Sequence, residues 1–424
     1  MISTQPPKHR DEFRVAIMCA LSREADAVSL LFDEFWDEAG DPYGRVKSDT
    51  NFYITGRIGK HNVVLTIMSG MGTNSATYAA VNLRASYTGL QLILIVGICG
   101  GLPRIGDKNA YLGDVVVSKQ IVGYDNMFDD GPGRPNADVR PLLAVLDTEF
   151  MEKRLKMAAA IYLKELQQEA KEQMRRAEYH YPGAKTDAIY RPEYSHKHKD
   201  LCRACAEDPD FFCRSAFQSS CVEIGCEPDK LIPREHREDL PIGADFAPEI
   251  FIGRLGSGNT VMKSGLDRDR IAAKYNVVAF EMEGAGIGEE FPCIVVKGIC
   301  DYADSHKNKT WQNFAAATAA SVAKAILAWF PSSSGGQHEP PPKAYHESNE
   351  LSVANNALVD TAWVSQGDIL GSLTYNSEPV QTPEQLSIIE VHRRVYIGYE
   401  RTAFFVVLHA VWLWLLLMAL IAVE

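Results

Sequence analysis

The feature that most constrains the fold is an alternation, over the first two-thirds of the chain, of short β-branched runs with stretches of helical character. This alternation is typical of an α/β protein, in which helices cover the faces of a central sheet. The predicted strands cover residues 14–19, 51–56, 62–68, 92–96, 114–118, 249–255, 277–281 and 294–299. The sequence therefore predicts an α/β fold.

Four helices are predicted from side-chain periodicity and end signals. Ser22 can cap a helix that runs to about Phe32, and residues 73–86 form an alanine-rich, glycine-free stretch. Residues 151–178 have the composition of a long amphipathic helix. A last helix is predicted over residues 311–330, at the end of the domain. Pro331 ends this helix, because proline cannot continue it.

Composition bounds the class of protein. The 424 residues are 46% hydrophobic and 23% charged, which suffices for a sizeable core. The formal net charge of -12 disfavours nucleic-acid binding, which needs clustered Lys and Arg, so no nucleic-acid partner is expected.

The polar stretch 1–12 cannot act as a secretory signal. Cysteines in apolar segments (Cys19, Cys99, Cys293 and Cys300) indicate reduced thiols, so we expect a cytoplasmic catalytic part.

The pattern divides the chain into a tail (1–13), a catalytic domain (14–330), a flexible linker (331–392) and an apolar C-terminal helix (403–423). About 21 apolar residues span a bilayer core, and Arg393, Arg394 and Arg401 precede them, so the end is predicted to anchor the protein with its enzyme part in the cytosol. A buried helix and a mispredicted gene end are the alternatives.

Residues 181–248 interrupt the α/β pattern as an irregular insertion rich in Cys, His and Pro. Cys202 and Cys205 form a C-x-x-C, and Cys221 and Cys226 follow, with Cys213, His196 and His198 nearby. Zinc sites are built from such thiolate pairs, although the irregular spacing is equally compatible with free thiols in a loop.

Carboxylates follow three predicted strands. Glu24 lies in the first turn after residues 14–19, Glu281 and Glu283 end another strand, and Asp301 and Asp304 end a third. Helix capping or a solvated strand end would explain each one singly. Ligands bind beyond the carboxyl ends of parallel strands, so three such ends indicate a site. Two glycine-rich turns, 69–72 and 97–101, would let backbone approach a ligand.

Taken together, these motifs resemble those of the superfamily of purine nucleoside phosphorylases and methylthioadenosine/S-adenosylhomocysteine nucleosidases. The resemblance runs from about Arg14 to Phe330, outside the insertion, and is closest to nucleoside phosphorylase-like domains of fungal proteins. It lies in the stretches GRIGKHNVV, GSGNTVMKSG, FEMEGAGI and GICDYADSHKNKTWQNFAAATAA. It implies a mixed central sheet flanked by helices, a small-molecule purine substrate, a homo-oligomer and no metal or organic cofactor for the reaction.

The resemblance also implies roles for individual residues. Glu24 falls on the glutamate that activates water, and Asp301 on the acid that protonates purine N7, for which it would have to hold or share a proton. Met282 and Glu283 fall on the ribose-binding pair. The positions implied around the base are Ile98, Cys99, Gly100, Val261, Met262, Ala303 and Trp311.

The chain departs from the phosphorylases where they hold phosphate. Ile95 and Ile98 replace an arginine and a serine, and Glu24 replaces an arginine, so a carboxylate would oppose phosphate there. The nucleosidases carry a Ser-Gly-Asp motif, and this chain has Ser257-Gly258-Asn259 in its place. The aspartate of the motif is thus replaced by an asparagine, which cannot ionise.

The sequence thus favours a purine nucleosidase that hydrolyses an adenine nucleoside or nucleotide. The alternatives are a phosphorylase, and a non-catalytic nucleoside-sensing module in signalling. The 5′ substituent of the substrate stays open, and the basic candidates for binding a 5′-phosphate are Arg134, Lys263, Lys307 and Lys309.

Overall fold

The computed structural model describes residues 5–125, 136–198, 202, 205, 213–235, 237, 246–287, 291–307 and 309–331. All of them belong to one compact unit, Met1–Glu347. Among these residues no helix is long and apolar enough to cross a membrane. The predicted anchor over 403–423 lies outside the described residues, as does the predicted linker beyond Pro331.

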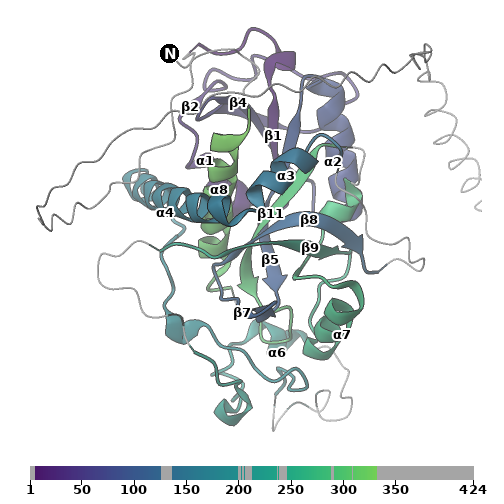
Figure 1. Cartoon of the computed structure of the whole chain (residues 1–424), viewed down its shortest axis with the longest axis vertical. Coiled ribbons are helices and arrows are strands. Elements are labelled where there is room, and N and C mark those ends of the chain that lie inside the picture. Colours follow the sequence, from purple (N-terminus) through teal and green to yellow (C-terminus); the bar gives the residue numbers. More distant parts are fainter. Residues whose placement is uncertain are drawn as a thin grey trace, which may run out of the picture. The chain divides into compact units, whose positions relative to one another are not determined.

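A nine-stranded mixed sheet forms the centre of this unit, in the order β10-β9-β8-β11-β5-β1-β4-β3-β2 (Figure 1). Its strands are β1 (Val15–Cys19), β2 (Glu34–Phe35), β3 (Tyr53–Ile58), β4 (His61–Ile67), β5 (Leu92–Gly101), β8 (Val115–Gly123), β9 (Ile250–Ser257), β10 (Ala279–Glu281) and β11 (Cys293–Asp301). A separate hairpin joins β6 (Arg104–Ile105) to β7 (Lys108–Asn109). Strands β1, β4, β5 and β11 are parallel neighbours, whereas β8 runs antiparallel to β11. The predicted α/β fold with a mixed sheet is confirmed.

The helices are α1 (Ser22–Ser29), α2 (Thr73–Ser86), α3 (Arg140–Leu146), α4 (Glu149–Glu172), α6 (Arg214–Gln218), α7 (Gly265–Tyr275) and α8 (Gln312–Trp329). Helix α1 begins one residue after its N-cap Leu21, so Ser22 is not the cap, and it ends before Phe32. Helix α4 ends at Glu172 and does not reach the predicted residue 178. Met174, just beyond this end, adopts the left-handed conformation (φ 51°) that commonly ends a helix. Helix α7, which was not predicted, begins at the cap Ser264.

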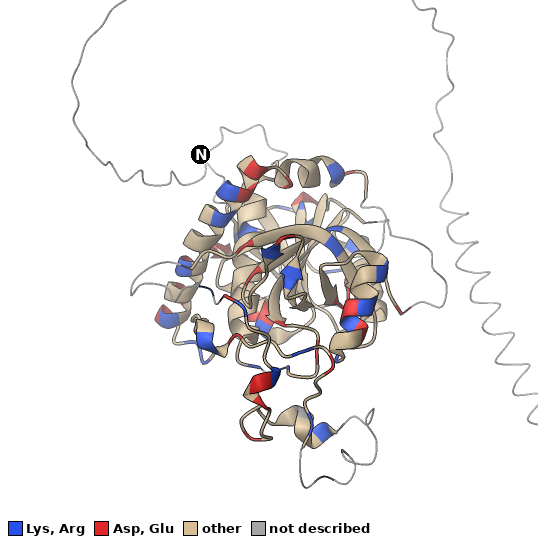
Figure 2. Ribbon diagram, turned by 60° about the horizontal axis from the view of Figure 1, so that its bottom comes forward, with Lys and Arg blue, Asp and Glu red and all other residues tan. Residues whose placement is uncertain are grey.

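Helix α8 packs against β11 and β5, with α1 and α4 beside it. Its alanine-rich face is buried, and it approaches β11 closely at Gly298, where an added Cβ would lie 2.0 Å from the Ala315 carbonyl oxygen. Charged positions are spread along the outer helices, and further ones lie at the centre of the molecule (Figure 2).

The predicted turn at 97–101 is wrong, because β5 continues as a strand through Gly101. Its last two residues, Gly100 and Gly101, pair with β10, and Gly100 pairs with β11 as well, so the strands β10, β9, β8, β11 and β5 form a closed set of neighbours. Glycine is required there for close packing rather than for a turn. An added Cβ at Gly101 would lie 2.7 Å from the Ile299 side chain.

Candidate active site

A cavity of about 990 Å³ lies beyond the carboxyl ends of β1, β5, β10 and β11. Three of these strands, β1, β5 and β11, are parallel, so their ends meet at one edge of the sheet. Ten of the eleven residues predicted for catalysis, ribose binding and base binding line this cavity. They are Glu24, Ile98, Cys99, Gly100, Val261, Met262, Met282, Glu283, Asp301 and Ala303.

Glu24 is buried at the cavity wall and fixed by backbone donors. Its Oε2 accepts hydrogen bonds from the amides of Ala20 and Leu21, both at 2.9 Å, and its Oε1 accepts one from Ile98 at 2.9 Å. Gly97 makes room for the carboxylate, since an added Cβ would lie 2.3 Å from Oε1. Among the described residues Oε1 has one such donor, which leaves it an acceptor position.

Burial raises the pKa of Glu24, while Lys297 and the amides of Ile98 and Leu21 act in the opposite direction. A raised pKa makes this carboxylate a stronger base than an exposed glutamate. It can therefore take a proton more readily near neutral pH.

Lys297 is a buried cation that the sequence reasoning missed. Its Nζ lies 2.8 Å from Glu283 Oε2, and both side chains are almost fully buried. Burial alone would lower the pKa of Lys297, but the carboxylates of Glu283, Glu24 and Glu281 raise it. The available signal was a lysine in the middle of the otherwise apolar run 293–300.

The Lys297 charge also decides the state of Glu283. Burial alone would raise the pKa of Glu283, but the charge and hydrogen bond of Lys297, together with the backbone amides of Gly72 and Met282, lower it. Glu281 serves the backbone instead, accepting hydrogen bonds from the amides of Glu283 (2.9 Å) and Gly284 (3.0 Å). Glu283 is thus an ionised acceptor at the cavity, held in place by its neighbours.

Asp301 ends β11 beside a second lysine, the partly buried Lys307. Its Oδ1 lies 3.1 Å from Lys307 Nζ and accepts a hydrogen bond of 2.9 Å from the Ala303 amide. Burial alone would lower the pKa of Lys307, but Asp301 and Cys300 raise it. Gly100 leaves space for Asp301, since an added Cβ there would lie 2.8 Å from Asp301 Oδ1. The Lys307 ammonium thus keeps its proton beside the Asp301 carboxylate.

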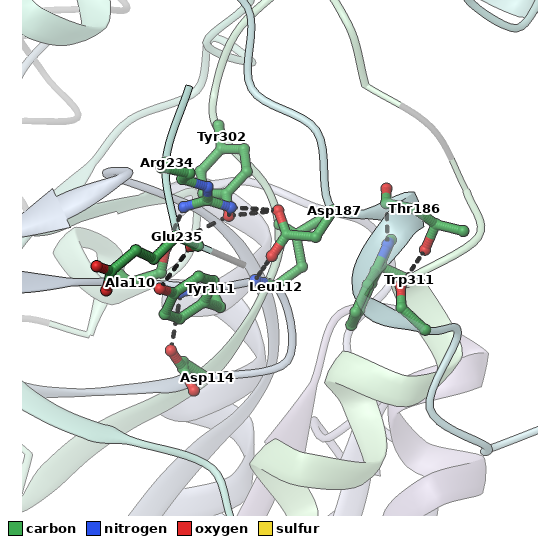
Figure 3. Close-up of polar contacts among 11 residues, drawn as sticks. Ala110, Tyr111, Leu112, Asp114, Thr186, Asp187, Arg234, Glu235, Tyr302 and Trp311 are labelled. Carbon is green, nitrogen blue, oxygen red and sulfur yellow. Dashed lines mark hydrogen bonds and ion pairs between the residues drawn. The ribbon is translucent and has the colours of Figure 1, made fainter. Parts of the chain in front are cut away.

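Trp311 is the exception among the predicted residues, because it does not line the cavity. Its ring is fully buried against Tyr181 and Phe314, and its Nε1 donates to the Thr186 carbonyl at 3.4 Å (Figure 3). Thr186 and Tyr181 lie at the start of the insertion. The predicted contact of Trp311 with the purine base is therefore not found. Trp311 packs against the start of the insertion instead.

The insertion is joined to the segment that follows β11 by a buried polar network (Figure 3). Arg234 forms an ion pair with Asp187 and contacts the Tyr302 hydroxyl, which donates to Asp187 at 2.7 Å. Asp187 Oδ2 also accepts a hydrogen bond of 3.0 Å from the Leu112 amide. Because Tyr302 directly follows Asp301, the network positions the end of β11.

Comparison with known proteins places this site in a family. The model of the phosphorylase superfamily matches residues 14–329. A nucleotide-binding leucine-rich repeat (NLR)-like protein of Hyaloscypha variabilis is 30% identical over 330 residues, which cover 76% of this chain and 30% of that protein. The chain thus spans about a third of the length of this relative.

Solved structures with a similar fold include two of Helicobacter pylori proteins. Its futalosine hydrolase and its 5′-methylthioadenosine/S-adenosylhomocysteine nucleosidase are each 14% identical, with a TM-score of 0.43, and each match covers 75% of this chain and 99% of theirs. The corresponding nucleosidase of Neisseria meningitidis is 15% identical with a TM-score of 0.41, covering 74% and 98%.

The buried lysine provides a stability test of the site. Lys297→Met leaves buried carboxylates without their counter-charge and should destabilise the protein by about 3–5 kcal/mol in urea unfolding. Adding Glu283→Gln should restore part of this loss, because it removes the stranded charge. Lys153→Met, which breaks an exposed ion pair with Glu149, is the control and should leave stability unchanged. A Lys297→Met protein as stable as this control would contradict the role of Lys297 as the counter-charge of the buried carboxylates.

Proposed function

We propose that this chain, which belongs to the phosphorylase superfamily, hydrolyses the N-glycosidic bond of a purine nucleoside or nucleotide. The observation that carries the proposal is the Glu24 carboxylate, held by three backbone amides at the cavity with an acceptor position on Oε1. A water molecule that donates to this position would lie oriented for attack. Asp301 and Glu283 on the same cavity supply the other two groups that the reaction needs.

Each of these groups has one part in the reaction. The water oxygen forms a bond to the anomeric carbon while the bond from that carbon to purine N9 breaks and its electron pair moves into the base. Glu24 takes a proton from the water, and the Asp301–Lys307 pair delivers a proton to N7, so the base leaves neutral. Glu283, kept ionised by Lys297, accepts from the ribose hydroxyls and positions the sugar.

Water is favoured over phosphate as the nucleophile by the charge at this wall. A phosphate dianion beside the anomeric carbon would lie close to the Glu24 carboxylate and be repelled. Ile95 is buried in β5, and Ile98 offers the cavity an apolar side chain where a phosphate-holding serine is expected in phosphorylases.

Substitution of the two proposed proton-transfer groups tests the mechanism. Glu24→Gln should keep substrate binding but lose on the order of a hundredfold or more in kcat, the scale of a missing general base. It should also lose the acid limb of the pH–rate profile, because protonation of Glu24 produces that limb. Asp301→Asn should lose a comparable rate.

The assay follows release of free adenine without added phosphate, and Glu152→Gln, on the surface of α4, serves as the control with normal turnover. Undiminished turnover by Glu24→Gln, or ribose 1-phosphate as the main product, would refute the mechanism. A wild-type protein that binds adenosine without turnover would favour the sensing module, a reading supported by the likeness to an NLR-like protein.

Basic side chains at the cavity favour a substrate that carries phosphate. Arg214, Lys263, Lys307 and Lys309 line it, together with the acidic Glu223. Burial and the neighbouring charge of Lys307 lower the pKa of Lys263, so these two ammonium groups lie close enough to repel each other. A phosphate group beside them would offset this repulsion. Arg134, the other basic candidate, lies outside the described residues.

This substrate preference is tested at Lys263. Lys263→Met should lower kcat/KM for adenosine 5′-monophosphate by roughly tenfold or more, the value of one charge-assisted hydrogen bond, and leave that for adenosine unchanged. Lys119→Met, on the surface ion pair with Asp147, is the matched control. Equal effects of Lys263→Met on both substrates would contradict a phosphate contact at this residue.

A further inference from the structure

The insertion gathers its cysteines and two histidines into two separate clusters. His198, Cys202, Cys205 and Cys213 form the first, and His196, Cys221 and Cys226 form the second. Within each cluster all ligand atoms lie within 4.8 Å of one another. The sequence suggested Cys202, Cys205, Cys221 and Cys226 as candidates for zinc, but the structure divides these four between two places. We propose that the insertion binds two zinc ions, one in each cluster, and that these ions fix the outer wall of the active-site cavity.

The spacing of the ligand atoms fits tetrahedral zinc. Zn–S bonds of about 2.3 Å and Zn–N bonds of about 2.0 Å at the tetrahedral angle place nitrogen and sulfur about 3.5 Å apart. In the first cluster His198 Nδ1 lies 3.7 Å from Cys205 Sγ and 3.6 Å from Cys213 Sγ. In the second, His196 Nδ1 lies 3.7 Å from Cys221 Sγ and 3.3 Å from Cys226 Sγ.

Thiol hydrogen bonds alone do not account for this arrangement. An imidazole nitrogen that carries no proton has a single lone pair, so it accepts one S–H well, whereas two sulfurs lie near Nδ1 in each cluster. A metal ion resolves the conflict, because both sulfurs and the nitrogen then point to one centre. The thiols lose their protons on binding, since the thiolate is the ligand.

The tautomer of His196 is set for metal binding. Its Nε2 lies 3.0 Å from the Ala216 carbonyl oxygen and 2.9 Å from that of Ser219. Carbonyl oxygens only accept, so Nε2 carries the proton and the lone pair is on Nδ1, which faces the two sulfurs. A backbone carbonyl bound to the distal nitrogen is the usual second-sphere support of a zinc-bound histidine.

The two clusters enclose the segment that forms the outer wall of the cavity. Arg214, Gln218, Ser219, Ser220 and Glu223 line the cavity. Helix α6 follows the ligand Cys213 directly, and the segment after it leads to the ligand Cys221. A metal ion at each end of this segment would hold it in place.

Zinc would also compensate for the small core of this part of the insertion. Between residues 213 and 230 the buried apolar side chains are those of Ala216 and Ile224 among the described residues. Metal coordination gives order where buried apolar side chains are few, as in small metal-bound domains. The second cluster also contacts the loop that follows Asp301, because the His196 amide donates to Ser305 Oγ at 2.9 Å. The metal would thus connect the wall to the loop that follows Asp301.

Metal analysis of the purified full-length protein tests the two sites. The wild type should contain about two equivalents of zinc per chain, one for each cluster. Cys205→Ser and Cys226→Ser should each retain about one, and the double variant about none. Cys293→Ala, a buried cysteine in β11 outside both clusters, is the control and should retain both. Zinc absent from the wild type, or disulfides among these cysteines in its intact mass, would overturn the proposal.

The role of the zinc ions at the cavity wall rests on the proposed function and has its own readout. In the double variant KM should rise more than kcat falls, while circular dichroism shows the core still folded. Unchanged kinetics in a zinc-free double variant would overturn the wall role. If the wild type shows no turnover, the proposed function fails, but the metal content still decides whether the sites exist.

Discussion

The site depends on one buried charge interaction, that of the Lys297 ammonium with the carboxylates that surround it. Glu283 pairs with it directly, and Glu24 and Glu281 lie close enough for their charges to act on it. Three buried carboxylates on neighbouring strand ends would otherwise repel one another and favour protonation. With the lysine in place the pKa of Glu283 is lowered, whereas burial keeps the pKa of Glu24 raised in spite of the same cation. The two carboxylates of one cavity thereby differ in basicity.

Glycines in β5 provide the space that this arrangement needs. Gly97 faces Glu24, and Gly100 faces Asp301 and Ala303, each at distances that a Cβ could not tolerate. The same strand pairs with β11 and β10, whose ends carry Asp301 and Glu281. A single strand thus brings the proposed base, the proposed acid and the proposed ribose-binding residues to one place. Enzyme sites on rigid strand ends have the geometric precision that proton transfer requires.

The sequence predicted most of this framework, because its strands are continuous apolar runs and its polar residues stand at their ends. Glu24, Glu283 and Asp301 were found in this way, and the structure places all three on the cavity. Lys297 was missed, since a single charge inside an apolar strand gives no pattern until its partners are known. The glycines at 97–101 suggested a turn, because glycine marks both turns and close packing. The partition of the insertion cysteines depends on how the chain folds back, which spacing does not encode.

Whether water or phosphate is the nucleophile separates hydrolysis from phosphorolysis, and isotope incorporation distinguishes the two. The reaction would be run on adenosine in ¹⁸O-enriched water with saturating phosphate present, and the sugar reduced with borohydride at early times, before its anomeric oxygen exchanges with solvent. If water is the nucleophile, the ribose product carries one ¹⁸O, above the level of a control of unlabelled ribose in the same water. Recovery of the sugar as ribose 1-phosphate, with its anomeric oxygen derived from phosphate, would contradict it.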